Sequence, residues 1–487
     1  MRRTSPGTHL AVLAAAQFTV MLATSIVNVA LPQIRDGVGL SGDATTWVVN
    51  AYGLAFGALL LAGGRAADLL GRRRVLTVGL GTFGAASAAA GLAASPAVLV
   101  TARIVQGIGA AAVAPAALAL AVGLHPPGAA RGRVLAVWGA VSGAGGAAGV
   151  LLGGLLTRAG GWPWIFHTVA AGTLAVLVAT LLLVPPAARG AAAGFDLAGT
   201  ATSALALTAL VWALTTARGH GWSDARVLAA FAAAAALGAV FLRVERRAAS
   251  PLVPPRLFAG GTVAAGNLLM GLFGSVWIAL FYFLPLYQQQ VLGEDPLTTG
   301  IGQLPLAAAN MLGAVLAPAL VRRVGGRAAL VGALLVEAAG MLWLSRIGAG
   351  GGYLADVLGP SILVGLGLSV AFVRLTALSV SGVTGADAGL AGGLVNTTRQ
   401  VGGAVGLAVL ATVAGTVTSH AGAHQAQSAA LTAGYRTAFA LSAAVLLATA
   451  ALAALLLRRG RAGARDTDPR PARPEDLSRT EDLSLTD

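Results

Sequence analysis

Fourteen apolar stretches, most of them about 20 residues long, constrain this chain more than any other feature. A helix rises about 1.5 Å per residue, so roughly 20 apolar residues cross the hydrocarbon core of a bilayer. The stretches lack the period-two alternation of barrel strands, which leaves helices as the form that satisfies their backbone in lipid. We therefore predict an all-α polytopic membrane protein. Its expected spans are 10–31, 46–66, 74–95, 97–122, 133–155, 162–184, 196–217, 226–244, 262–286, 298–321, 327–345, 353–380, 388–415 and 434–457.

The distribution of arginine predicts the orientation of these spans. All 32 basic residues are arginine, and 23 of them lie in alternate loops and in the two tails. Positive charge stays on the cytoplasmic side during insertion, so we expect both termini in the cytoplasm and an even number of spans. The all-arginine set and the abundant alanine and glycine suggest a GC-rich bacterial genome, hence a multi-pass protein of the bacterial cell membrane.

The composition also excludes several function classes. The net charge of +14 is carried by short loops and not by a basic folded domain, so we expect a lipid bilayer as partner and no nucleic acid. The chain has no lysine for a phosphate loop or Schiff base, and no cysteine for disulfides or thiolate sites. Paired carboxylates, metal sets and nucleophile–base pairs are missing from the apolar stretches, so we expect no enzyme, no cofactor and no metal.

A weak internal repeat predicts the domain organisation. A shift of 254 residues places Gly64 on Pro318, Asp68 on Arg322 and Gly71 on Gly325. We therefore expect two related six-helix bundles that face each other around a midplane site. The predicted units are an N-terminal bundle (1–186), a linker with two extra transmembrane helices (187–260), a C-terminal bundle (261–457) and a disordered cytoplasmic tail (458–487).

One polar loop resembles a known family signature. The pattern Gly-x-x-x-Asp-x-x-Gly-Arg-Arg between the second and third spans is similar to the loop motif of the major facilitator superfamily. In this chain it comprises Gly64, Asp68, Gly71, Arg72 and Arg73. The resemblance implies the major facilitator fold and a role for Asp68 in latching the inward-closed state.

Four further stretches are similar to the fourteen-spanner drug:proton antiporter branch of that family. The first is 22–32 in the first helix, and the second is 103–109 in the fourth helix, with Arg103, Gln106 and Gly107. The third is a row of glycines in the fifth helix, namely Gly139, Gly143, Gly145, Gly149 and Gly153. The fourth is 389–403 in the thirteenth helix. The resemblance implies a secondary active transporter that exports a small amphipathic drug or antibiotic in exchange for protons by alternating access. It also implies a proton-coupling role for Arg103, and we expect a monomer.

Two departures from the branch leave alternatives open. Ala23 stands where the branch usually has an aspartate, and Val150 stands where it has a proline. A metabolite facilitator or importer of the same fold, and a receptor-like membrane protein that does not transport, are therefore alternative interpretations.

Ionisable side chains inside the apolar stretches are costly, which makes each a functional candidate. They are Arg103, Glu337, Arg374 and Arg399. Glu337 and Arg374 lie at a similar depth, about 14–15 Å, on consecutive predicted helices, so they could form a buried ion pair. That pair is either structural or a protonation site in which Glu337 replaces the missing first-helix aspartate.

The balance of these charges predicts a neutral or positive central cavity. Such a cavity disfavours lipophilic cations, so we expect a neutral or anionic amphipathic substrate. The residues that could line it are polar or aromatic, and for each a helix–helix hydrogen bond is an equal alternative. They are Asn28, Asn50, Tyr52, Asn267, Trp277, Tyr282, Gln303, Asn310, Asn396, Arg399 and Gln400.

Overall fold

A computed structural model describes residues 6–125, 129–185, 196–248, 251–253, 255–258, 261–383, 388–422 and 426–459. Helices make up nearly all of these ranges, and no strand occurs within them. The predicted tail from residue 460 onward, and parts of the linker, lie outside the described residues.

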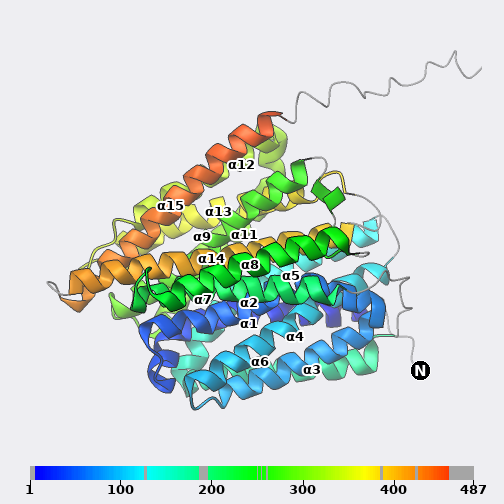
Figure 1. Ribbon diagram of the computed structural model, residues 1–487, viewed down its shortest axis with the longest axis horizontal. Coiled ribbons are helices and arrows are strands. Elements are labelled where there is room, and N and C mark those ends of the chain that lie inside the picture. Colours follow the sequence, from blue (N-terminus) through cyan, green and yellow to red (C-terminus); the bar gives the residue numbers. More distant parts are fainter. Residues whose placement is uncertain are drawn as a thin grey trace, which may run out of the picture.

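Six helices form the N-terminal bundle, coloured blue to cyan in Figure 1. Helix α1 packs on α5, α2 on α4, and α3 on both α4 and α6. Serine caps begin two of them, because the Ser41 and Ser95 side chains accept hydrogen bonds from backbone N–H groups of the first turn. The helices are α1 (Pro6–Val38), α2 (Gly42–Leu70), α3 (Arg72–Gly91), α4 (Pro96–Gly123), α5 (Ala129–Gly160) and α6 (Pro163–Leu183).

The C-terminal bundle repeats this arrangement. Helix α9 packs on α14 as α1 packs on α5, and α12 packs on α13 and α15 as α3 packs on α4 and α6. One span is broken at Gln303, where Pro305 lacks the N–H that would continue the helix. The elements are η1 (Pro255–Phe258), α9 (Thr262–Gln290), α10 (Pro296–Gly302), α11 (Leu304–Val324), α12 (Gly326–Leu344), η2 (Tyr353–Leu358), α13 (Gly359–Ser379), α14 (Ala388–Gly422) and α15 (Gln427–Arg459).

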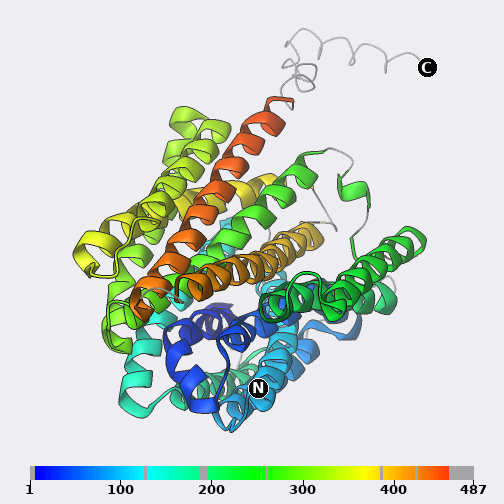
Figure 2. The ribbon, with the colours of Figure 1, turned by 60° about the vertical axis from the view of Figure 1, so that its left-hand side comes forward.

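Two extra helices lie beside both bundles. Helices α7 (Leu197–His220) and α8 (Ala225–Arg247) pack on each other, and α7 also packs on α2 and α14, one helix from each bundle. Figure 2 shows them at one side of the molecule. They therefore follow the N-terminal bundle in sequence but cover the seam between the bundles in space.

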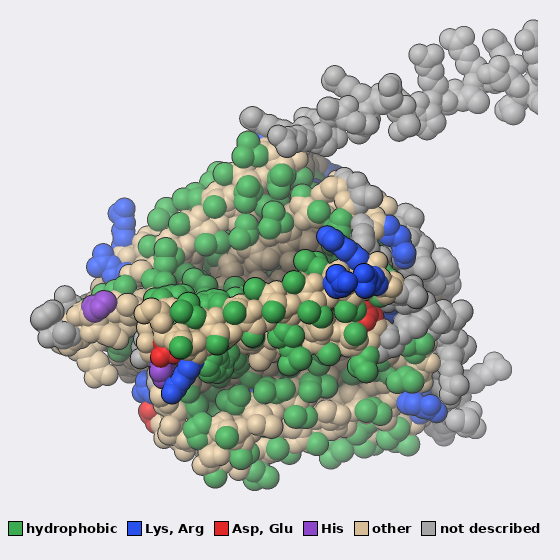
Figure 3. Space-filling model, in the orientation of Figure 1, with side chains coloured by type: hydrophobic (Ala, Val, Ile, Leu, Met, Phe, Trp, Pro, Cys, Tyr) green, Lys and Arg blue, Asp and Glu red, His purple; other side chains and the backbone are tan. Residues whose placement is uncertain are grey.

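Thirteen helices in the described part of the chain are long and apolar enough to cross a membrane, counting each broken span once. The remaining expected span is α3, whose three initial arginines and several glycines lower its mean hydropathy, yet it packs against α4 and α6 like its neighbours. Figure 3 shows a wide band of hydrophobic side chains, with charged side chains near the two ends. The predicted all-helical membrane fold is confirmed.

The helices run between two ends of the molecule, called the basic end and the opposite end. The basic end holds the turns at Gly71 and Gly325, and the opposite end holds the turns at Gly39 and Gly293. All four glycines have positive φ angles between 68° and 99°, which favour glycine because a Cβ is strained there.

Candidate functional site

The polar loop between α2 and α3 ties helix ends of the N-terminal bundle together. Asp68 accepts hydrogen bonds from Nε and Nη2 of Arg72 at 3.2 and 3.1 Å. Arg72 also donates to the Ala119 carbonyl of α4 at 3.3 Å, and Arg73 donates to the Leu181 carbonyl of α6 at 2.7 Å. Asp68 therefore pairs with an arginine of its own loop.

The glycines of this loop have different roles. Gly71 has φ 99° and ψ 123° between the two helices, a conformation that only glycine adopts readily. A Cβ on Gly64, by contrast, would make ordinary contact with Pro115 at 3.6 Å. Among the described residues, the hydrogen bonds of this loop's side chains stay inside the N-terminal half and the linker, where Arg65 donates to the Pro251 carbonyl at 3.4 Å. The latch role of Asp68 therefore stays a prediction.

Arg103 lies at the centre of a buried network in the N-terminal bundle. Its Nε donates to the Val48 carbonyl at 2.8 Å, its Nη1 donates to Gln106 at 2.6 Å, and its guanidinium lies 4.4 Å from the Tyr52 ring centroid. Gln106 in turn donates to the Ser87 hydroxyl at 2.7 Å. The side chain is 1% exposed, so these contacts replace water for the charge.

Gly107 lets this network close. A Cβ there would lie 2.6 Å from the Tyr52 carbonyl oxygen, so α4 can approach α2 this closely only with glycine. The motif residues Arg103, Gln106 and Gly107 therefore hold α2, α3 and α4 together. Their contacts fit a structural clamp, and the coupling role that the resemblance implies stays a prediction.

The glycines of α5 fall into two groups. Gly145, Gly149 and Gly153 face α1, where a Cβ would collide with backbone atoms around Phe18, Leu22 and Ile26, respectively. A Cβ added at Gly139 or at Gly143 would have no atom of another element within 4 Å. The spacing of four residues places the first three on one helix face, so they set the distance between α1 and α5.

Glu337 and Arg374 do not form the expected ion pair. Glu337 is fully buried in α12 against Gly367 of α13, and neither carboxyl oxygen has a hydrogen-bond partner in the described part of the chain. The guanidinium of Arg374 instead lies against Gly326, the first residue of α12. Eleven residues of helix, or about 16 Å, separate Gly326 from Glu337. The long arginine side chain has reached the basic end.

The position of α12 also changes the interpretation of Glu337. This helix packs on α13 and α15, both in the C-terminal bundle. Glu337 therefore lies inside one bundle and not between the two.

Several predicted cavity residues make contacts within or between helices, while their role in a cavity stays a prediction. Asn267 donates to the Val263 carbonyl at 2.9 Å and accepts from Thr398 of α14 at 3.1 Å, and Gln303 donates to Gln288 at 2.9 Å. Tyr282 packs edge-to-face on Phe283. The backbone of Asn310 lies against Gly365 of α13.

Other predicted cavity residues have polar atoms without hydrogen-bond partners among the described contacts. They are Oδ1 of Asn28, both amide atoms of Asn50, and Oε1 of Gln400, whose Cβ lies close to Gly57 of α2. Tyr52 donates to the Val20 carbonyl of α1 at 3.4 Å.

One cluster joins an arginine to three aromatic rings. The guanidinium of Arg399 in α14 lies 5.2 Å from the Trp277 ring centroid in α9. Trp277 packs edge-to-face against Phe273 of α9 at 5.6 Å and Phe372 of α13 at 5.2 Å. Arg399 also donates to Asn396 at 3.5 Å. Sequence reasoning found Trp277, Asn396 and Arg399 but missed both phenylalanines, because nothing local marks them among so many apolar residues.

The two bundles touch at the opposite end through amides. Gln33 of α1 donates to Gln289 of α9 at 3.2 Å, and Gln289 donates to the Val29 carbonyl at 2.7 Å. The nearby loop holds two carboxyl groups. Burial raises the pKa of Glu294, whereas hydrogen bonds from Thr298 lower the pKa of Asp295, which caps α10 and lies 3.9 Å from Arg158 of α5.

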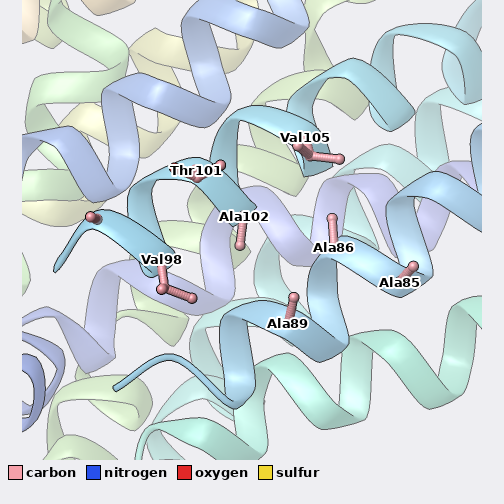
Figure 4. Close-up of a pocket in the computed structure, with 8 residues that line it drawn as sticks. Ala85, Ala86, Ala89, Val98, Thr101, Ala102 and Val105 are labelled. Carbon is pink, nitrogen blue, oxygen red and sulfur yellow. The ribbon is translucent and has the colours of Figure 1, made fainter. Parts of the chain in front are cut away.

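An apolar groove lies between α3 and α4, as Figure 4 shows. Its lining includes Ala85, Ala89, Val98 and Thr101. None of the predicted site residues lines it, so it is not the candidate site.

The repeated bundles, the apolar band and the polar residues at the seam define a helical membrane transporter. The chain belongs to the major facilitator superfamily, whose family model matches residues 13–407. It is 40% identical to the puromycin resistance protein pur8 of Streptomyces alboniger over 96% of this chain and 94% of that protein. It is 39% identical to the cephamycin export protein CmcT of Amycolatopsis lactamdurans over 93% of each chain.

The fold is also similar to a solved transporter. A bacterial homologue of the human lysosomal transporter Spinster, in an inward-facing and occupied conformation, superposes with a TM-score of 0.69 at 16% identity. The match covers 93% of this chain and 98% of that one. The predicted family membership is confirmed, and the chain is a transporter and not an enzyme.

Proposed function

We propose that this protein exports a small amphipathic drug or antibiotic across the bacterial cell membrane in exchange for protons. The observation that carries the proposal is the full-length similarity to two proteins named for antibiotic resistance and export, at 40% and 39% identity. The substrate itself does not follow from this similarity, because the two relatives are named for different compounds and are almost equally similar.

The geometry supports alternating access of the two bundles. Helix α2 packs on α14, α5 packs on α10 and α1 packs on α9, so both bundles contribute several helices to the seam. Glycines bring α5 close to α10, since a Cβ on Gly154 would collide with the Pro296 carbonyl. Close packing through small residues at such a seam supports rocking of one bundle against the other. Asp68 with Arg72 is the proposed latch of the inward-closed state at the basic end.

The orientation rests on the arginines. The basic end is proposed to face the cytoplasm, with both termini on that side and the lipid bilayer around a monomer, because loop arginines stay cytoplasmic during insertion.

Glu337 is the proposed proton carrier. Ala23 is fully buried in α1 and leaves no carboxylate at the position where related antiporters usually have aspartate. A charged Glu337 would have no partner, and an unpaired buried charge costs several kcal/mol. Proton binding therefore removes the free-energy cost of a buried charge at Glu337. This change in free energy can be linked to a rearrangement of α12 and α13.

The test uses purified protein in proteoliposomes with an imposed pH gradient. Proton flux and drug uptake are followed for a panel of amphipathic antibiotics with the wild type, Glu337→Gln and Glu245→Gln. Glu245 is a suitable control because it is also buried but accepts hydrogen bonds from the backbone N–H groups of Leu252 and Val253.

The proposal predicts drug-dependent proton flux in the wild type and the control, and its loss in Glu337→Gln. Drug movement without proton flux in the wild type would refute proton exchange and indicate a facilitator. Full flux in Glu337→Gln would instead remove Glu337 from the coupling mechanism.

A further inference from the structure

The cluster around Arg399 contains a cation for which the protein supplies no matching anion. None of the three ion pairs in the described part of the chain includes Arg399. Its Nε atom is buried without a hydrogen-bond partner in the described part of the chain, and the hydrogen bond from its Nη2 to Asn396 is long at 3.5 Å. Much of the donor fork of this guanidinium is therefore unused.

The position of Arg399 is fixed by its helix and not by its side chain. The backbone of α14 touches α9 at this level, because a Cβ on Gly274 would collide with backbone atoms of Arg399. Gly402 makes an equally close approach to Gly271 one turn further along. Such packing leaves little freedom to move the arginine away from Trp277, so the unused donors are presented at a defined place.

That place lies toward the other bundle. The Cβ of the adjacent Gln400 lies close to Gly57 of α2, the helix of the N-terminal bundle that also contains Tyr52. Arg103 lies over the ring of the same tyrosine. At about 16 Å from the start of α14, Arg399 is also deep within the span. Two guanidinium groups therefore belong to helices that pack on α2, namely Arg103 of α4 and Arg399 of α14, and the buried Ala23 adds no negative charge.

We propose that Arg399 and Trp277 form the recognition site for an aromatic carboxylate, which makes the exported substrate an anionic amphipathic compound. The inference rests on the proposed export function and specifies its substrate class. A carboxylate pairs with two parallel N–H groups of a guanidinium, a geometry that Arg399 has free. The aromatic body of the substrate packs on Phe372, beside the Trp277 ring that Arg399 covers.

The same geometry disfavours cations. A cationic substrate would use the face of Trp277, but Arg399 already covers that ring. It would also approach a second positive charge in a medium that screens poorly. The site therefore selects by charge sign as well as by shape.

The test measures equilibrium binding to the full chain in nanodiscs of phosphatidylcholine, which has no net charge. The probes are naphthalene-1-acetate, 1-naphthylmethylamine and 1-naphthylmethanol, which share the ring system and differ in charge. Wild type is expected to bind the carboxylate at least tenfold more tightly than the amine. Equal or tighter binding of the amine would overturn the inference without any variant.

Three variants locate the effect. Arg399→Gln is expected to weaken carboxylate binding at least tenfold while leaving the alcohol unchanged, and Arg399→Lys is expected to fall between the two. Arg374→Gln is the matched control, because that arginine belongs to the same bundle but lies against Gly326 at the basic end. Unchanged carboxylate binding in both Arg399 variants, or an equal loss in the control, would overturn the assignment.

A parallel measurement separates this inference from the proposed function. Nanodiscs with added phosphatidylglycerol test whether a lipid headgroup is the anion at Arg399, in which case lipid displaces the carboxylate from the wild type and the substrate assignment fails. If antibiotics are exported in proteoliposomes but the carboxylate does not bind, the export function stands and the anion site falls. If the carboxylate binds but nothing is exported, the site stands and the export function falls.

Discussion

The row of glycines on α5 provides the sharpest test of the packing. In Gly149→Ala the added methyl group would collide with the Ser25 hydroxyl and lie 2.9 Å from the Leu22 carbonyl oxygen. It would also lie 3.1 Å from the Ile26 nitrogen. Backbone atoms cannot turn aside as a long side chain can, so α1 and α5 must separate.

The magnitude follows from a comparison with Gly143→Ala on the same helix. Overpacking of a close contact costs about 1–3 kcal/mol. Alanine also favours a helix over glycine by about 1 kcal/mol, a gain that both variants share. A methyl group added at Gly143 would lie in open space, so the difference in stability between the two variants isolates the packing cost. We expect Gly149→Ala to be less stable than Gly143→Ala by about 1–3 kcal/mol.

The assay is thermal unfolding of the detergent-solubilised protein, followed by intrinsic fluorescence, with drug export by the same variants in proteoliposomes. Gly149→Ala should unfold at a lower temperature than Gly143→Ala and export more slowly. If the two variants unfold at the same temperature, the contact of α5 with α1 does not limit stability, and the reasoning from glycine spacing fails.

Three further predictions concern other parts of the molecule. Arg103→Gln should destabilise the protein by about 1–3 kcal/mol in the same unfolding assay, because it leaves the buried Val48 carbonyl and Gln106 without their donor; wild-type stability would contradict the clamp. Gly71→Ala should cost about 1–3 kcal/mol because of its positive φ, whereas Gly64→Ala should change stability little, and equal effects would refute the distinction. Burial raises the pKa of Glu294 in the folded protein. The protonated side chain therefore stabilises the fold fully below the usual pKa of about 4.3, and this contribution is lost as the pH rises through the raised pKa. Glu294→Gln should therefore match the wild type near pH 4 and unfold at a higher temperature than the wild type at pH 8.

The sequence predicted the features that depend on local pattern. Apolar stretches gave the spans, and the repeat of the Gly64–Arg73 loop indicated two related bundles. The spacing of Gly145, Gly149 and Gly153 matched one helix face. These properties depend on the helix period and on the length of a span, and both can be read from one stretch of the sequence.

Features that depend on side-chain reach or on distant helices could not be predicted in this way. Helical rise placed Glu337 and Arg374 at equal depth, but it ignored the length of the arginine side chain, which carries its charge to Gly326. The contact between Gln33 and Gln289 joins residues 256 positions apart, and Phe372 meets Trp277 only because α13 crosses α9. No periodicity within one helix contains that information.

The amide contacts between Gln33, Gln289 and Val29 have a consequence for the energetics of transport. Each neutral hydrogen bond contributes about 0.5–1.5 kcal/mol, so two of them favour the joined arrangement by roughly 5- to 150-fold. Neither bond involves a full charge, so this bias should hold across a wide range of ionic strength. An exporter built in this way keeps this end closed by a weak bias, and only the part contributed by the Arg158–Asp295 pair, 3.9 Å apart, weakens as salt is added.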